Sequence, residues 1–264
     1  MKNREYFLWM ALGCGFLISA FILIPLLNMI WAPSLQSLKQ TIQEKAVIKA
    51  IWLSIYTSGV AALIAFLFGT PFAYLLSRKE FFGKRLVESI IDLPIVIPHP
   101  VVGIAILGVT GKNHWIGRIL YRLGIRIMGS IPGIITVLVF VGLPFYMDTV
   151  KAGFDAISPR LEAVSRSLGA SLPRTFLCIT FPLAARSVLI GIIMCIARAV
   201  SEFGAVVVVA YHPMIAPVLI YERFEGYGLA YSQPIAVWLI LFCLILFLVL
   251  RMLSLPRKKN NDQD

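Results

Sequence analysis

The stretch AIWLSIYTSGVAALIAFLFGTPFAYLL, from Ala50 to Leu76, decides the fold class because it carries no charged residue. A helix needs about 20 predominantly apolar residues to cross a bilayer, and this stretch is long enough. Its small residues Ala61, Ala65 and Gly69 recur at intervals of four. Small residues at this spacing let a neighbouring helix approach closely. The sequence therefore predicts a membrane-spanning helix with a contact face, used within the chain or across a dimer.

Further apolar blocks extend this pattern over the rest of the chain. They are Phe7–Trp31, Leu93–Val109, Ser130–Met147, Ser187–Ala210 and Tyr231–Leu250. The 264 residues are 59% hydrophobic and only 14% charged, with a mean hydropathy of +0.87. In soluble domains about a quarter of the residues are charged. The composition excludes an ordinary soluble protein, and the blocks predict an all-α membrane protein with six transmembrane helices.

The first block resembles a secretory signal, because Lys2 and Arg4 precede it. Its apolar run is much longer than the core of a signal peptide, and no A-x-A cleavage site follows. We therefore expect the first span to be retained. The expected organisation is a first transmembrane helix with its outer loop (1–48), a transmembrane core (49–253) containing a long loop (155–183), and a polar cytoplasmic tail (254–264).

The formal charge of +11 is spread between the apolar blocks rather than gathered on one basic face. This distribution argues against a nucleic-acid partner. With six spans and both termini in the cytoplasm, most lysines and arginines face inward, as the positive-inside rule requires. We therefore expect a multi-pass protein of the cell membrane. The basic outer loop Lys112–Arg126 is the exception, and it either weakens this topology or marks a surface for an anionic partner.

The longest connection between predicted spans is the cytoplasmic stretch Lys151–Arg186. Connections in compact proteins usually have a handful of residues. Ser158 and Pro159 predict a helix start, with serine as the N-cap and proline at the first helical position. Glu162 and Arg166 have the i,i+4 spacing of an ion pair on one helix face.

Gly169 is the expected end of this short helix, because many helices end at a residue in the left-handed conformation. Pro173 is expected to open a second short segment, and Pro182 to precede the next span. A capped amphipathic element of this length indicates a docking surface.

This loop, LEAVSRSLGASLPRTFLCITFPL from Leu161 to Leu183, resembles the cytoplasmic signature of the permease subunits of ABC importers. That signature is a Glu-Ala-Ala helix with a glycine six positions after the glutamate and a proline further on. Gly169 and Pro182 stand at the family's spacing. The signature glutamate position holds Ala163, because Glu162 lies one residue earlier.

The resemblance implies the type I ABC-importer permease fold with a short cytoplasmic coupling helix that fits a cleft on an ATPase subunit. It implies as partners two copies of that ATPase, which would carry ATP and Mg, a second copy of this chain, an extracytoplasmic oxyanion-binding protein and membrane lipid. The chain itself is expected to bind no cofactor. The residues that the resemblance assigns to the ATPase-coupling loop are Glu162, Ala163, Val164, Ser165, Gly169 and Pro182.

Two further stretches are similar to the molybdate/tungstate branch of the family, with the sulfate branch close behind. They are DLPIVIPHPVVGIAIL, Asp92–Leu107, and ARAVSEFGAVVVVAYHPMIAPVLIYERF, Ala197–Phe224. The resemblance implies ATP-driven translocation of molybdate or tungstate by alternating access. A sulfate/thiosulfate permease, a secondary carrier or channel, and a membrane-embedded enzyme are the alternatives. The sequence has no P-loop, H-E-x-x-H or G-x-S-x-G motif, so we expect no catalysis by this chain.

Arg198 and Glu202 are the charged pair within a predicted span. A charge at membrane depth costs about 2.5–3.5 kcal/mol on insertion scales, so such residues face the protein interior and pair. Their i,i+4 spacing predicts a pair on one helix face. The pair is either a gate for an oxyanion, with neighbouring Ser201 and Gly204, or a structural contact between helices.

The third predicted span contains Pro94, Pro98 and Pro100, each of which removes a backbone donor. Irregular backbone at membrane depth is tolerated only inside protein or beside water. We therefore expect this segment to line the translocation pathway, together with His99. No histidine or cysteine spacing in the sequence indicates a metal site.

Overall fold

The computed structural model describes residues 2–254, in which all regular structure is helical. The helices, with η1 and η2 denoting π-helical turns, are α1 (Lys2–Trp31), α2 (Leu35–Gln43), α3 (Lys45–Ile64), η1 (Ala65–Gly69), α4 (Thr70–Arg78), α5 (Lys84–Val96), α6 (His99–Thr110), α7 (Trp115–Arg122), α8 (Ile131–Asp155), α9 (Pro159–Ser167), α10 (Leu172–Thr175), η2 (Phe176–Thr180), α11 (Phe181–Val200), α12 (Gly204–Val209), α13 (Ala216–Tyr227) and α14 (Leu229–Ser254). Five helical stretches can cross a membrane, or six when the bent pair α5 and α6 counts as one span. The predicted number of spans is confirmed.

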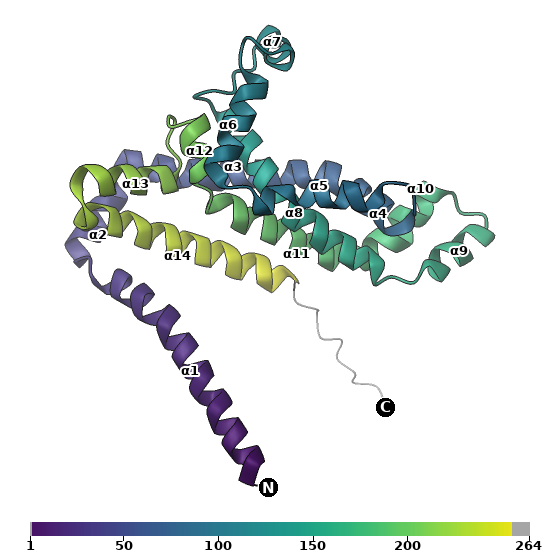
Figure 1. Cartoon of the computed structure of the whole chain (residues 1–264), viewed down its shortest axis with the longest axis horizontal. Helices are drawn as coiled ribbons and strands as arrows, with labels where there is room; N and C mark the ends of the chain where they lie inside the picture. The colour runs from purple at the N-terminus through teal and green to yellow at the C-terminus, as the bar shows by residue number, and fades with distance from the viewer. Residues whose placement is uncertain (1, 255–264) are drawn as a thin grey trace.

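Helices α3, α8, α11 and α14 lie along one another and form the bundle (Figure 1). Lipid tails are as apolar as leucine, so close packing rather than hydrophobicity holds membrane helices together. Helices α8 and α11 meet through glycines, because a Cβ at Gly191 would lie 2.8 Å from Val150 Cγ2, and one at Gly142 would lie 2.7 Å from Cys195 Sγ. Both glycines are therefore required for this approach.

The second span runs without interruption from Lys45 to Arg78 through α3, η1 and α4. Its small-residue face packs inside the chain, because Ala61 and Ala65 are fully buried and a Cβ at Gly69 would lie 2.9 Å from the ring of Tyr146. This face therefore contacts α8 of the same chain, which decides between the two alternatives left open by the sequence.

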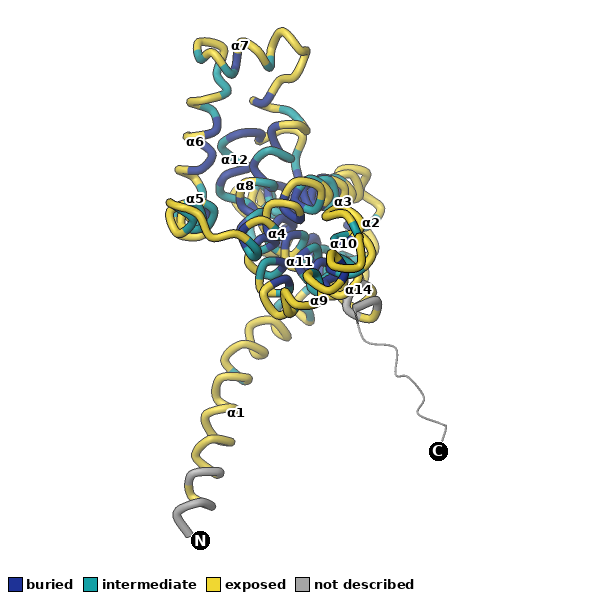
Figure 2. Tube along the Cα trace, turned by 90° about the vertical axis from the view of Figure 1, so that its right-hand side faces the viewer, coloured by how far each residue is buried: buried dark blue, intermediate teal, exposed yellow. Residues whose placement is uncertain are grey.

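The third predicted span is not one helix. Helices α5 and α6 meet at an angle of 115°. Ile97 is extended, with φ −71° and ψ 133°, because the residue before a proline is disfavoured in the helical region. Pro98 is then the N-cap of α6, and α6 carries α7 away from the bundle (Figure 2).

The fifth predicted span, Ser187–Ala210, is shifted in the structure. The helix starts at Leu172, runs through α10, η2 and α11, and ends at Val200. Pro182 therefore lies within this span rather than before it. A proline inside a helix removes an i→i−4 hydrogen bond, and the π-helical turn η2 stands just before it. The second span has the same arrangement, with η1 just before Pro71.

Helix α1 leaves the bundle, and the apolar window of its span, Trp9–Trp31, is 0% buried (Figure 1). The segment that follows contains α2, which packs against α14. The predicted polar tail lies outside the described residues except for Ser254.

Candidate functional site

Helix α9 projects from one end of the bundle together with α10 (Figure 1). It begins after Ser158 with Pro159 in its first turn, as predicted, although the Ser158 side chain makes no capping hydrogen bond. Its end is also as predicted, because Gly169 has φ +87°. Gly169 N donates to Arg166 O at 2.9 Å and Ala170 N donates to Ser165 O at 3.2 Å, which is the Schellman pattern of a glycine-terminated helix.

The predicted ion pair between Glu162 and Arg166 is wrong. Within the described residues, Glu162 pairs with Arg78 at the end of α4, where Arg78 Nε lies 2.8 Å from Glu162 Oε1. Tyr74 Oη donates to Glu162 Oε2 at 2.9 Å, and Thr180 Oγ1 donates to Oε1 at 3.0 Å. The Glu162 side chain is only 12% exposed, so it faces the bundle rather than an external partner.

These four residues, Tyr74, Arg78, Glu162 and Thr180, are called the anchor below. Arg78 extends it by donating to the backbone oxygens of Phe154, at 2.9 Å, and Ile157, at 3.1 Å. The anchor therefore joins α9 to α4, to η2 and to the end of α8. It fixes the position of α9 relative to two membrane spans.

The anchor also sets the charge of Glu162. Burial by itself raises the pKa of this carboxyl, but hydrogen bonds from Arg78, Tyr74 and Thr180 outweigh burial and hold the pKa below its ordinary value of 4.5. Glu162 is therefore ionised at neutral pH, which strengthens each hydrogen bond that it accepts.

The opposite face of α9 is apolar and exposed. Leu161, Val164 and Leu168 are 47%, 59% and 84% exposed. Ala163, which stands at the signature glutamate position, is exposed as well, whereas Ser165 is buried and hydrogen-bonds Thr175 at 3.1 Å. An exposed apolar face on an element outside the membrane marks an interaction surface.

A second polar cluster lies where α6, α11 and α12 meet, and we call Arg198, Glu202 and His99 the latch. Arg198 Nη2 lies 2.7 Å from Glu202 Oε2 and 2.8 Å from a ring nitrogen of His99. The predicted pair is confirmed, but not on one helix face, because α11 ends at Val200 and Glu202 follows the break. Ser201 Oγ bonds the Arg198 carbonyl at this break, at 3.0 Å.

Glu202 is 1% exposed and makes a second contact through its other carboxylate oxygen. Its Oε1 accepts a hydrogen bond from Ala205 N at 3.0 Å, which satisfies a free donor at the start of α12. One carboxylate therefore holds the Arg198 guanidinium and caps the next helix. Only Nη2 of Arg198 takes part in the side-chain contacts of the described residues, so Nε and Nη1 can donate to another group.

Glycines bring α6 and α12 together around the latch. A Cβ at Gly204 would lie 3.1 Å from His99 Cβ and 3.4 Å from Pro100 Cδ. A Cβ at Gly103 would lie 2.8 Å from Ala205 O. The three prolines have different positions. Pro98 and Pro100 lie at the start of α6, beside the latch, whereas Pro94 is buried within α5.

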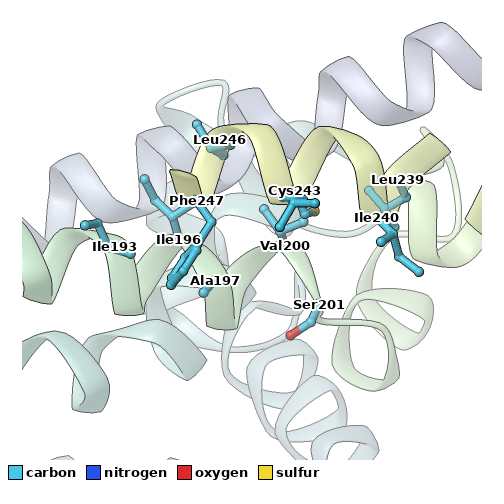
Figure 3. A pocket seen from close by; sticks show the side chains of 11 residues that line it. Ile193, Ile196, Ala197, Val200, Ser201, Leu239, Ile240, Cys243, Leu246 and Phe247 are labelled. Atoms are coloured by element: carbon cyan, nitrogen blue, oxygen red, sulfur yellow. The ribbon is translucent and has the colours of Figure 1, made fainter. Parts of the chain in front are cut away.

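A cavity of about 480 Å³ lies between α11 and α14 (Figure 3). Its walls include Ile193, Ile196, Cys243 and Phe247, with Ser201 at one end. An apolar cavity cannot replace the hydration of a charged ion. This cavity is therefore not a binding site for an anion.

The sequence did not single out Tyr74, Arg78 or Thr180. Arg78 carries the first charge after the apolar stretch that ends at Leu76, which is a usable signal. Nothing in the spacing shows that its partner lies 84 residues away. Pro182, which the sequence assigned to the coupling loop, follows Thr180 of the anchor by two residues.

Comparison with known proteins gives consistent matches over the chain. Residues 68–257 match the family described as binding-protein-dependent transport system inner membrane component. The molybdate/tungstate transport system permease protein of Pyrococcus furiosus is 43% identical over 96% of this chain and 97% of its own length. The corresponding protein of Methanocaldococcus jannaschii is 41% identical over 91% of this chain and 94% of its own length. A sulfate transport system permease protein of Synechocystis is 34% identical over 75% of this chain and 71% of its own length.

Among solved structures, a chain of a bacterial alginate ABC transporter in complex with an alginate-bound periplasmic protein superposes with a TM-score of 0.78. It is 16% identical, with 96% of this chain and 95% of that chain covered. A chain of the MetNI methionine ABC transporter in an inward-facing conformation gives 0.64 at 17% identity, with 79% and 94% covered. These structures share the helical architecture. The chain is a multi-pass membrane protein of the binding-protein-dependent transport system inner membrane component family.

Proposed function

We propose that this chain is the permease subunit of an ATP-driven importer that carries a tetrahedral oxyanion, molybdate or tungstate, across the cytoplasmic membrane. One observation supports the assignment of the substrate. Four molybdate/tungstate permeases match at 41–43% identity over 91–96% of this chain. The sulfate permeases match at 30–34%.

The proposed complex contains two copies of this chain around a two-fold axis, two ATPase subunits and an external oxyanion-binding protein. The ATPases bind ATP and Mg²⁺, and this chain binds no cofactor. The exposed apolar face of α9, with Leu161, Val164 and Leu168, docks on the ATPase. Both termini lie in the cytoplasm, which places α9 on the same side.

The contacts of the anchor allow α9 to transmit force from the ATPase to the membrane spans. ATP-driven closure of the ATPases would move α9, and the buried hydrogen bonds of Glu162 tie α9 to α4 and η2. The attached spans then move with it. Alternating access follows when the two copies rotate relative to each other.

The latch supports a gating role. Arg198 offers a cation at a break between helices. Irregular backbone at membrane depth is tolerated only inside protein or beside water, so this break lies beside the pathway in our proposal. Glu202 neutralises this cation while the pathway is closed, and the free donors of the guanidinium can bind an oxyanion. Binding of the anion would weaken the contact of Arg198 with Glu202 and favour opening.

Uptake by the reconstituted complex tests this proposal. Proteoliposomes containing this chain, its ATPase and the binding protein should accumulate radiolabelled tungstate only with ATP and Mg²⁺. A tenfold excess of molybdate should compete, and the same excess of sulfate should compete much less. Transport of sulfate in preference to tungstate would overturn the substrate assignment, whereas uptake without the ATPase would overturn the importer.

A further inference from the structure

The hairpin formed by the end of α6, α7 and the following loop carries a charge that the transport scheme does not use. It contains the cations Lys112, Arg118, Arg122 and Arg126, while no acidic residue occurs between Asp92 and Asp148. None of these cations forms an ion pair in the part of the chain that the structure describes. The hairpin is therefore a surface of uncompensated positive charge.

A cavity of about 460 Å³ lies within this hairpin. Lys112 reaches it from the turn after α6, and Arg126 from the loop before α8. Lys112 Nζ lies 5.0 Å from the centre of the Tyr121 ring, a cation–π contact that positions the ammonium group without neutralising its charge. Leu107 and Ile127 form apolar walls.

The walls of the cavity are fixed by backbone contacts. Gly117 is buried, and a Cβ there would overlap the carbonyl of Gly111, so α7 packs directly on the preceding turn. Helix α7 ends with Gly124 at φ +76°. Gly129 N donates to Val209 O at 2.9 Å, which ties the loop to α12. A cavity held in this way is formed before any ligand binds.

We propose that this cavity binds a tetrahedral oxyanion group between Lys112 and Arg126. Cations beside apolar walls attract an anion more strongly than cations in water, because the local dielectric constant is lower. No carboxylate of the hairpin competes for them. The same chemistry belongs to a free MO₄²⁻ ion and to the phosphate of an anionic lipid headgroup.

The position of the cavity indicates what a free oxyanion bound in it could do. Ile127 belongs to the same hydrophobic cluster as Ala205 and Val209 of α12, the helix that Glu202 caps. A free oxyanion bound here would lie close to the helix that Glu202 caps. This assignment to the transported ion rests on the proposed function, whereas binding of an oxyanion group does not.

The test uses the assembled complex of permease and ATPase in nanodiscs, without the binding protein and in buffer free of phosphate and sulfate. Equilibrium binding of radiolabelled tungstate is measured in zwitterionic lipid, and native mass spectrometry counts retained phosphatidylglycerol in mixed lipid. The variant is Lys112→Gln/Arg126→Gln. The matched control, Arg118→Gln/Arg122→Gln, removes the same charge from the same hairpin outside the cavity.

We expect the Lys112→Gln/Arg126→Gln variant to lose about tenfold or more in affinity, since two charged hydrogen-bond donors are removed, with the control unchanged. A loss of tungstate affinity identifies a free oxyanion as ligand, and a loss of retained phosphatidylglycerol identifies a lipid phosphate. Equal results for wild type and variant in both measurements overturn the proposal, as does an equal loss in the control. Failure of ATP-dependent uptake with intact binding would overturn only the proposed function.

Discussion

The anchor and the latch use the same chemistry in different settings. Each contains a poorly exposed glutamate bound to one arginine and to further polar groups. Glu162 accepts hydrogen bonds from residues 84, 88 and 18 positions away, on two other elements, α4 and η2. Glu202 accepts hydrogen bonds from residues four and three positions away. A more distant residue, His99, lies 3.5 Å from its carboxylate, and the His99 side chain is 42% exposed.

This difference shows which cluster can move. Moving α9 away from the bundle would break every contact of Glu162 at once and leave a charge without partners, which is costly in a poorly exposed site. Moving α6 away from α11 removes only His99 from the latch, because Arg198, Glu202 and Ala205 stay together. In the proposed mechanism, the anchor therefore transmits motion and the latch opens.

The largest effect should follow from Glu162→Ala. The change removes three hydrogen bonds and leaves the Arg78 guanidinium with no carboxylate partner. ATP-dependent uptake should fall at least tenfold, because loss of one partner of a buried pair costs up to about 3–5 kcal/mol and this pair is nearly buried. Uptake and the amount of permease in the membrane are measured together.

Arg166→Ala is the matched control, because it removes the charge that stands at the i,i+4 position but does not contact Glu162. It should retain near-normal uptake. Equal losses in both variants would contradict the anchor, and normal uptake by Glu162→Ala would show that α9 does not need it.

Gly169→Asp should have the next largest effect. Residues other than glycine cost about 1–2 kcal/mol in the left-handed conformation that Gly169 adopts. Membrane insertion should be normal, since the position lies outside the spans, and ATPase pull-down should fall together with uptake. Gly226→Ala is the control, because its φ is not positive and a Cβ added there would meet no other atom within 4 Å. A Gly169→Asp protein that binds the ATPase and transports normally would remove α9 from the coupling path.

Arg198→Ala should reduce uptake about tenfold or more, and Arg198→Lys should reduce it less, since lysine keeps the charge but not the fork of donors. The amount of folded protein should stay near normal for the lysine variant. If both variants reduce protein in the membrane without changing the uptake per molecule, the latch is a structural contact and not a gate.

Sequence and structure agree best where the physics is local. The length of the apolar blocks predicted the number of spans, although the bounds of the fifth span were wrong. Ser158, Pro159 and Gly169 predicted the bounds of α9, because caps and left-handed positions depend on a few neighbouring residues. The disagreements depend on distant residues. The partner of Glu162 is on another span, so spacing along α9 pointed to Arg166 instead.

The prolines show the same limit. Pro98 breaks the third span into two helices, whereas Pro182 stands inside a continuous helix behind a π-helical turn. Proline removes a donor in both places, and the surrounding packing decides whether the chain bends. The partners of His99 and the closeness of Gly204 to α6 likewise needed the folded chain.

The smallest expected effect is a dependence on pH. The pKa of Glu162 is lowered in the folded protein from its ordinary value of 4.5, so its contribution to stability is present above that unfolded-state value. It is lost as pH falls through the lower folded-state value. The thermal stability of the wild-type complex should therefore fall more between pH 5 and about pH 3 than that of Glu162→Gln. Parallel curves for the two proteins would show that the ionised carboxylate adds nothing.

The central claim is that the anchor stays rigid while the latch moves. Its most direct test is a pair of distance measurements by electron paramagnetic resonance. Cysteine labels replace exposed residues on a background without the native cysteines, at Leu75 with Ser167 across the anchor, and at Ile104 with Met194 across the latch. Labelled chains are diluted with unlabelled ones, and the transporter is measured with and without trapped ATP. The Leu75–Ser167 distance should stay the same while the Ile104–Met194 distance changes. A change across the anchor with none across the latch would contradict the account.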